Sequence, residues 1–292
     1  MARPFHDRVL EAHINDQVLL KAWRKQINGT TSLGRHYHTF QESFDPAAGT
    51  YPGAALSRQQ ITGGNTPTVT GGYITFLDPT APDQNFLTFS HNRGENTASD
   101  GTLFLFDMLV SYQGFDANSA ASQVVTGGAG AGNTDLPRHD GRNVFMFLDT
   151  QTALGGTAAT IDVTYTNRAG TSARTTQTTS MIQLAFQSEL AHLGMALPLQ
   201  AGDDGVISVQ SLQLSAAMGA GTFAVVLGKL IAVLDFNDGA DTTAHDLVFR
   251  EIRARRLLTG AAISSIYRTN AGTADPIISG ELQVTFFDPA AT

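Results

Sequence analysis

The chain has 292 residues, enough for one large domain or two small ones, and 42% are hydrophobic, so a sizeable core is expected. It contains no Cys, which excludes disulfide scaffolds, thiolate metal sites and Cys nucleophiles. A formal net charge of -8 argues against a general nucleic-acid-binding protein. No apolar run approaches the roughly 20 residues of a membrane span, and the N-terminus lacks the pattern of a signal peptide.

The charged residues favour a protein that assembles with other subunits. They make up only 15% of the chain, against about 25% in an average globular domain. Only three of the 18 basic residues are Lys, and the others are Arg. Arg is enriched and Lys is depleted at protein interfaces, because guanidinium is weakly hydrated and pairs well with carboxylates.

Residues 1–28 are predicted to form an amphipathic helix. Apolar residues recur at spacings of three and four from Phe5 to Ile27, and Gly29 can supply the left-handed cap that ends the helix. Such a helix could lie on its own domain, or it could be an arm that docks on a neighbouring subunit. In the second case Trp23, the only Trp, is a candidate interface anchor.

Residues 29–100 are predicted to form an extended, turn-rich arm or long loops that run over a sheet. Gly pairs such as Gly71-Gly72 and several X-Pro steps such as Asp45-Pro46 interrupt the pattern every few residues. Short extended pieces remain at 72–77 and 85–89. Long irregular stretches are uncommon within compact domains.

Residues 101–292 carry a clear β signal. Their strand candidates are rich in Thr, Val, Ile and Phe, as pleated surfaces prefer, and lie at 103–110, 144–148, 161–166, 206–214, 222–234 and 280–287. The turn-like sequence at 167–170 predicts a hairpin between 161–166 and 171–176. Because there is no βαβ alternation and no repeat, we predict a mainly β chain with an antiparallel sandwich or jelly-roll-like domain.

Local motifs for catalysis or metal binding are absent. There is no nucleophile elbow, zincin motif or phosphate-binding loop. The acidic turn that begins at Asp235 fails the EF-hand pattern, since Gly239 is its fifth residue and Asp246 its twelfth. His36 and His38 could supply two zinc ligands, but no third ligand can be located. We therefore expect no catalytic residue, no cofactor and no bound metal.

One dense basic cluster remains as a candidate interface. It consists of Arg250, Arg253, Arg255 and Arg256. On an acidic chain such a cluster can be a solvated face that pairs with its own carboxylates, or it can dock onto an acidic subunit.

Three segments are similar to stretches that recur in virion structural proteins of tailed bacteriophages. They are Leu154–Thr171, Leu199–Ser211 and Gly221–Leu227, with weaker similarity back to about residue 100. The resemblance implies a β-rich, head-associated protein such as a capsid decoration or cement subunit, a class that often forms trimers clamping neighbouring capsomers. It implies no catalytic residue.

The sequence thus predicts a non-enzymatic capsid decoration subunit that stabilises a phage head by bridging capsomers of the major capsid protein. Its expected partners are the major capsid protein or other virion subunits and further copies of itself, with no nucleic acid and no membrane. Its expected location is the virion, assembled in the host cytoplasm. Two alternatives stay open: a tail or neck component, and a carbohydrate-binding or carbohydrate-hydrolysing β-sandwich, since paired carboxylates need no local motif.

Overall fold

The structure is a computed structural model, and it describes residues 5–51, 56–65, 67–68, 71–95, 101–236, 242–246, 255–270, 272 and 275–290. Within these ranges, regular structure is almost entirely antiparallel β-strand, with one α-helix and one short 3-10 helix. The predicted fold class is confirmed, because the chain is mainly β and its antiparallel sheets enclose apolar cores as in a β-sandwich.

The strands form three sheets, here called the β1 sheet, the central sheet and the β10 sheet. The β1 sheet has the order β15 (Thr242–Asp246), β6 (Gln84–Gly94), β18 (Ile277–Phe287), β1 (Val18–Gln26) and β3 (Ser43–Asp45), and β16 (Arg255–Leu257) also pairs with β6. The central sheet has the order β2 (His36–His38), β17 (Ala262–Thr269), β7 (Gly101–Asp116), β14 (Thr222–Phe236) and β9 (Val144–Thr152), with β4 (Ser57–Gln60) beside β7 and β5 (Ile74–Thr75) beside β17. The β10 sheet has the order β11 (Arg174–Thr175), β10 (Thr160–Asn167), β13 (Val206–Leu214) and β8 (Gln123–Val124), with β12 (Thr179–Ser180) beside β10. The helix α1 spans Phe5–Ile14, and the 3-10 helix η1 spans Thr39–Gln41.

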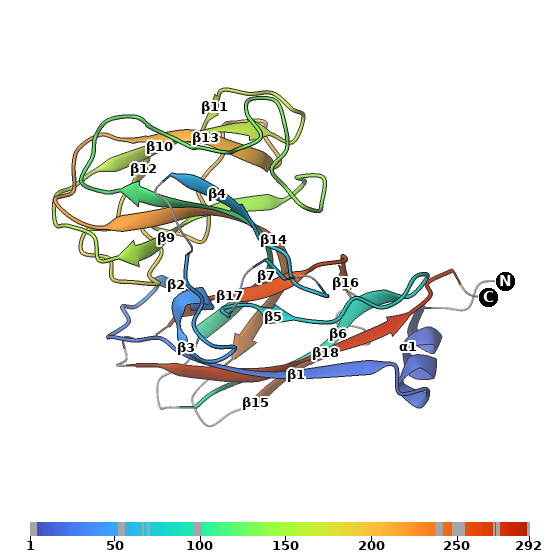
Figure 1. The fold of residues 1–292 in the computed structure, drawn as a ribbon. Helices are drawn as coiled ribbons and strands as arrows, with labels where there is room; N and C mark the ends of the chain where they lie inside the picture. Colours follow the sequence, from blue (N-terminus) through green and yellow to red (C-terminus); the bar gives the residue numbers. More distant parts are fainter. Residues whose placement is uncertain are drawn as a thin grey trace.

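The long strands β7 and β14 connect two lobes. They pair along almost their whole length, with three register shifts. One end carries Tyr112, Phe115 and Phe223 into a core shared with the β10 sheet. The other end carries Leu103 and Leu105 into a core shared with the β1 sheet. Figure 1 shows the β10 sheet above this pair and the β1 sheet below it.

The helix predicted over residues 1–28 is shorter than expected, which corrects that prediction. Helix α1 ends at Ile14, and Asp16 then adopts a left-handed φ of 57°. Residues Val18–Gln26 form β1, which pairs in unbroken register with β18, from Val18 opposite Thr285 to Gln26 opposite Ile277. This pairing with a strand at the far end of the chain overrides the local helical periodicity.

The 29–100 segment is not a separate arm in this structure. It contains β2 to β6, and each of these strands pairs with a strand of the β1 sheet or the central sheet. Strand β6 is internal to the β1 sheet, between β15 and β18. The sheets therefore do not follow the predicted division into 1–28, 29–100 and 101–292.

The predicted hairpin is confirmed. Strand β10 pairs with β11, with Tyr165 opposite Arg174. Gly170 lies in the connecting turn with a φ of 81°, a conformation in which residues with a side chain are strained.

Candidate functional site

Trp23 lies in the core between the β1 sheet and the central sheet. It is only 4% exposed, and it belongs to the same apolar cluster as Ile27, Leu103 and Leu282. The prediction that Trp23 anchors a partner is therefore corrected, because its indole ring already stabilises the fold and is inaccessible to another chain.

The four arginines of the predicted basic cluster are described only in part. Arg250 and Arg253 lie outside the described residues, and Arg255 is placed as the first residue of β16 without a description of its side chain. Arg256 is exposed on β16 and lines a pocket of about 270 Å³ together with Asp107, His139 and Lys229.

Asp107, which lines this Arg256 pocket, belongs to a buried ion pair with Arg138. The Asp107 carboxylate accepts hydrogen bonds from Arg138 Nε at 2.8 Å, from Arg138 Nη2, from His139 Nε2 at 2.9 Å and from the Ala262 amide at 3.1 Å. Burial alone raises the pKa of Asp107, but the hydrogen bonds from Arg138 and His139 outweigh it, so the pKa lies below its usual value. Asp107 is therefore ionised at neutral pH, and its charge is compensated by Arg138.

Three buried residues have the connectivity of a hydrolase triad. Ser264 Oγ lies 3.1 Å from His38 Nε2, and His38 Nδ1 lies 2.7 Å from Asp149 Oδ2. His38 and Asp149 have no exposed surface, and Ser264 is only 3% exposed. A substrate carbonyl cannot reach Ser264 Oγ in this arrangement, so the three residues act as a polar cross-link between β2, β9 and β17.

Sequence reasoning missed this triad because its members lie more than 100 residues apart and on three strands. It singled out His38 together with His36, as possible zinc ligands. In the structure the His38 ring is bonded to Asp149 and Ser264, whereas His36 lies near the Phe104 ring. The described residues hold no group of three or more His, Cys, Asp or Glu side chains that could bind a metal ion.

Two further histidines are buried in the neutral form. Burial is the main cause that lowers the pKa of His192 to about 3, and the charge of His36 adds to it. Burial also lowers the pKa of His36 to about 4, with a contribution from Arg268. Among the described residues neither ring nitrogen of His192 has a hydrogen-bond partner, although His192 is only 1% exposed.

We expect the substitution His192→Leu to reduce the acid sensitivity of the fold. The unfolded chain protonates this histidine near pH 6.5, and the folded chain does not until about pH 3, so wild-type stability falls as the pH drops below 6.5. Because only the unfolded chain protonates this histidine, the free energy of unfolding falls by about 1.4 kcal/mol per pH unit below pH 6.5. Between pH 6.5 and pH 5 the loss is roughly 2 kcal/mol. Burial raises the pKa of Glu42 to about 7, so protonation of Glu42 favours the folded state as the pH falls. This opposite effect is the same in the wild type and the variant.

Urea unfolding of both proteins at pH 7 and pH 5 measures this difference. At pH 7 the variant should be at least as stable as the wild type, because two unsatisfied buried nitrogens are removed. Equal losses of unfolding free energy in the two proteins between pH 7 and pH 5 would contradict the conclusion that His192 is buried in its neutral form.

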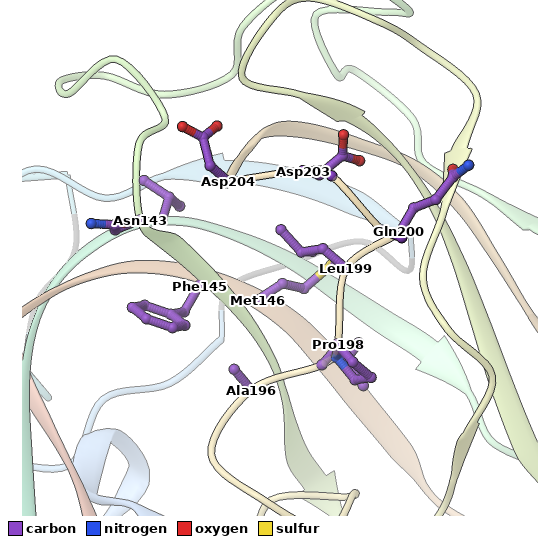
Figure 2. A pocket seen from close by; sticks show the side chains of 13 residues that line it. Asn143, Phe145, Met146, Ala196, Pro198, Leu199, Gln200, Asp203 and Asp204 are labelled. Carbon is purple, nitrogen blue, oxygen red and sulfur yellow. The ribbon is translucent and has the colours of Figure 1, made fainter.

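A second pocket, of about 490 Å³, lies where β9 begins. Its lining comes from residues 143–146 and 196–204. Figure 2 shows apolar side chains such as Phe145 and Leu199 within it, with Asp203 and Asp204 along one side. Both carboxylates are already paired: Asp203 with Arg174 at 2.9 Å and Asp204 with Arg168 at 3.0 Å. The pocket therefore offers apolar contact rather than an acid–base pair.

The outward side of the β1 sheet exposes apolar residues. Leu20 is 59% exposed and pairs across the sheet with Gln283, so the two share one face. The Gln283 side chain contacts His13 of α1 at 2.9 Å between the two nitrogens, which places α1 on that face too (Figure 1). Leu10 and Ile14 of α1 are 51% and 81% exposed. We call Leu10, Ile14 and Leu20 the apolar outer surface.

Beside this surface, strand β1 has an open edge. On one side β1 pairs with β18 along its whole length, but on the other it pairs with β3 only from Arg24 to Gln26. In the described part of the chain, the residues from Val18 to Trp23 therefore have no neighbouring strand on that side. An open edge of this kind can accept a strand from another chain.

Comparisons with known proteins leave the family open. No family model matches the chain, and no curated protein matches it significantly. The solved structures to which it is similar include particles of infectious bursal disease virus. The structure of the Gt strain has 9% identity and a TM-score of 0.17, and the match covers 92% of this chain and 81% of that one. The VP2 subviral particle has 8% identity and a TM-score of 0.17, with the same coverage.

A mutant VP2 in T=1 particles of the same virus has 9% identity and a TM-score of 0.16, covering 91% of this chain and 77% of that one. At TM-scores this low, the similarity assigns neither a fold family nor a role to the chain.

Among the described residues, no helix is long and apolar enough to cross a membrane.

Proposed function

We propose that the chain is a non-enzymatic structural subunit of a tailed-bacteriophage particle, and more specifically a capsid decoration subunit that bridges capsomers of the major capsid protein. The observation that carries this proposal is the open edge of β1 beside the apolar outer surface. The resemblance of residues 154–171, 199–211 and 221–227 to phage virion proteins supports the same role.

The open edge and the apolar outer surface suit attachment to a large assembly. A strand of the major capsid protein would pair with Val18–Trp23, and its side chains would cover the leucines and the isoleucine. Burying one such side chain contributes about 1.5–3 kcal/mol before the entropy of association is subtracted. Three of them contribute at most about 9 kcal/mol against an association cost of about 4–15 kcal/mol, so the contact also needs the hydrogen bonds of strand pairing. Copies of the chain, in a trimer, would multiply this contact over several capsomers.

The carbohydrate alternative is disfavoured by the aromatic residues. All six Tyr and the one Trp lie in the described part of the chain, and none of them is exposed. Sugar-binding surfaces use accessible Tyr and Trp rings for stacking, so this fold offers no such platform in its described residues. The alternative of a tail or neck component differs from the decoration role only in location and copy number.

We expect the triple variant Leu10→Gln, Ile14→Gln, Leu20→Thr to bind particles at least about 100-fold more weakly, since it removes several kcal/mol of apolar burial. Because the three side chains are exposed, the unfolding midpoint should change little. Co-sedimentation with purified particles that lack this protein measures the binding.

The matched control replaces three leucines of similar exposure elsewhere: Leu33, Leu184 and Leu193. With Gln at these positions, binding should stay close to that of the wild type. Wild-type binding by the first variant would contradict the proposed surface, and so would an equal loss of binding in the control.

A further inference from the structure

The Arg256 pocket has the size and lining of a small ligand site. It lies between β14, β16 and the loop that carries His139, and its volume is about 270 Å³. Pockets for drug-sized ligands usually occupy roughly 300–1,000 Å³, so this one fits a single small group rather than a nucleotide. Its polar lining is Asp107, His139, Lys229 and Arg256, and the remaining lining is aliphatic.

The lining carries a positive charge on a chain that is acidic overall. The Asp107 carboxylate has about four acceptor positions, and four hydrogen bonds occupy them. Its charge is compensated by Arg138, which also donates to the Ile61 and Met108 carbonyls at 2.8 and 2.6 Å. Asp107 and Arg138 together are neutral, and Arg256, which is exposed on β16, adds a positive charge to the described lining.

His139 is held at the wall of the pocket by a specific local structure. Its backbone has a φ of 67°, which is uncommon for a residue with a side chain. Its Nε2 is fixed by Asp107 at 2.9 Å. Nearby, the Lys229 ammonium donates to the Arg142 carbonyl, which holds the loop that follows His139 against β14. Asp107 thus positions the His139 ring, and the Arg142 carbonyl positions the Lys229 ammonium, without any ligand.

We propose that this pocket binds a small oxyanion, a carboxylate or phosphate group, through Arg256, with His139 and Lys229 on its wall. The planar guanidinium of Arg256 can donate two parallel hydrogen bonds to the two oxygens of such a group.

Isothermal titration of the full chain with glutarate and with inorganic phosphate tests the site. We expect saturable binding of at least one of these anions, and the substitution Arg256→Gln should weaken it about tenfold or more, as expected when a charge-assisted hydrogen bond is lost. The matched control is Arg93→Gln, which removes an exposed arginine from β6. It should leave the dissociation constant within about twofold, because surface charges far from a site contribute little.

Two results would overturn the proposal. One is the absence of saturation by either anion up to about 50 mM, which is weaker than a millimolar site. The other is an equal loss of affinity in Arg256→Gln and Arg93→Gln, which would reveal general charge attraction. A thermal melt of each variant shows that both remain folded.

The oxyanion can be a free molecule or an acidic side chain of another copy. Size-exclusion chromatography with and without glutarate separates these sources. If the resident group is a side chain from a second copy, saturating glutarate should shift the protein to a smaller species. If the ligand is a free anion, glutarate should bind and leave the elution volume unchanged. Both results support an oxyanion site.

Discussion

Replacing Arg138 with Met is expected to destabilise the fold by about 3–5 kcal/mol, the usual cost of removing one partner from a buried ion pair. The substitution leaves the Asp107 carboxylate, whose side chain is only 3% exposed, without its main counter-charge. It also leaves the carbonyls of Ile61 and Met108 without their guanidinium donor. Urea unfolding monitored by circular dichroism measures the loss.

A second substitution, at Asp107, tests whether the loss of stability comes from the uncompensated buried charge. Adding Asp107→Asn to Arg138→Met removes the buried charge but keeps an acceptor for the Ala262 amide, so much of the stability should return. Arg24→Gln breaks the exposed pair with Glu95 and should cost less than about 1 kcal/mol. A double variant as unstable as Arg138→Met alone would contradict the role assigned to the charge of Asp107.

Removing residues 1–28 is expected to prevent stable folding of the β1 sheet. The truncation deletes β1, which lies between β18 and β3, and with it the buried side chains of Trp23 and Ile27. Loss of one large buried side chain typically costs 2–5 kcal/mol, and a whole domain is stable by only about 5–15 kcal/mol. The truncated chain should therefore show a lost or strongly broadened thermal transition.

A shorter truncation separates the helix from the strand. Removing residues 1–14 deletes α1 alone and uncovers Phe86 and Phe287, which pack with Val9 and Ala12 of the helix. This chain should remain folded with a modestly lower melting temperature. A cooperative, wild-type-like transition after removal of residues 1–28 would show that β1 is not an integral strand.

The strands of the C-terminal part could be predicted from the sequence because their signals are local. The alternation from Ile161 to Thr166 and the turn that ends at Gly170 specify β10 and its hairpin without knowledge of the rest of the fold. The long apolar run within β14 likewise reflects a strand paired on both sides, with β7 and β9.

The N-terminal part could not be predicted because its structure depends on distant partners. Residues 18–26 have a spacing compatible with a helix, and only pairing with residues 277–285 makes them a strand. The extended pieces of 29–100 gave no indication that they would pair with sheets built from residues beyond 100. Trp23 was predicted as an interface anchor because the local sequence does not show that side chains from the opposite sheet bury its ring.

The polar sites follow the same rule. Arg256 was a candidate because other arginines lie close to it in the sequence. The structure adds His139 and Lys229 to its pocket, and both lie far from Arg256 in the chain. The contacts between Asp107 and Arg138 and between His38 and Asp149 join residues 31 and 111 positions apart. No local motif marks such pairs, so a single sequence does not reveal them.

Quantitative mass spectrometry of gradient-purified particles from the source tests the proposal that the chain is a structural subunit of a virus particle. A decoration role predicts a copy number comparable to that of the major capsid protein. A much lower copy number would place the chain in the tail or neck and contradict the decoration role. Its absence from the particles would contradict the structural role altogether.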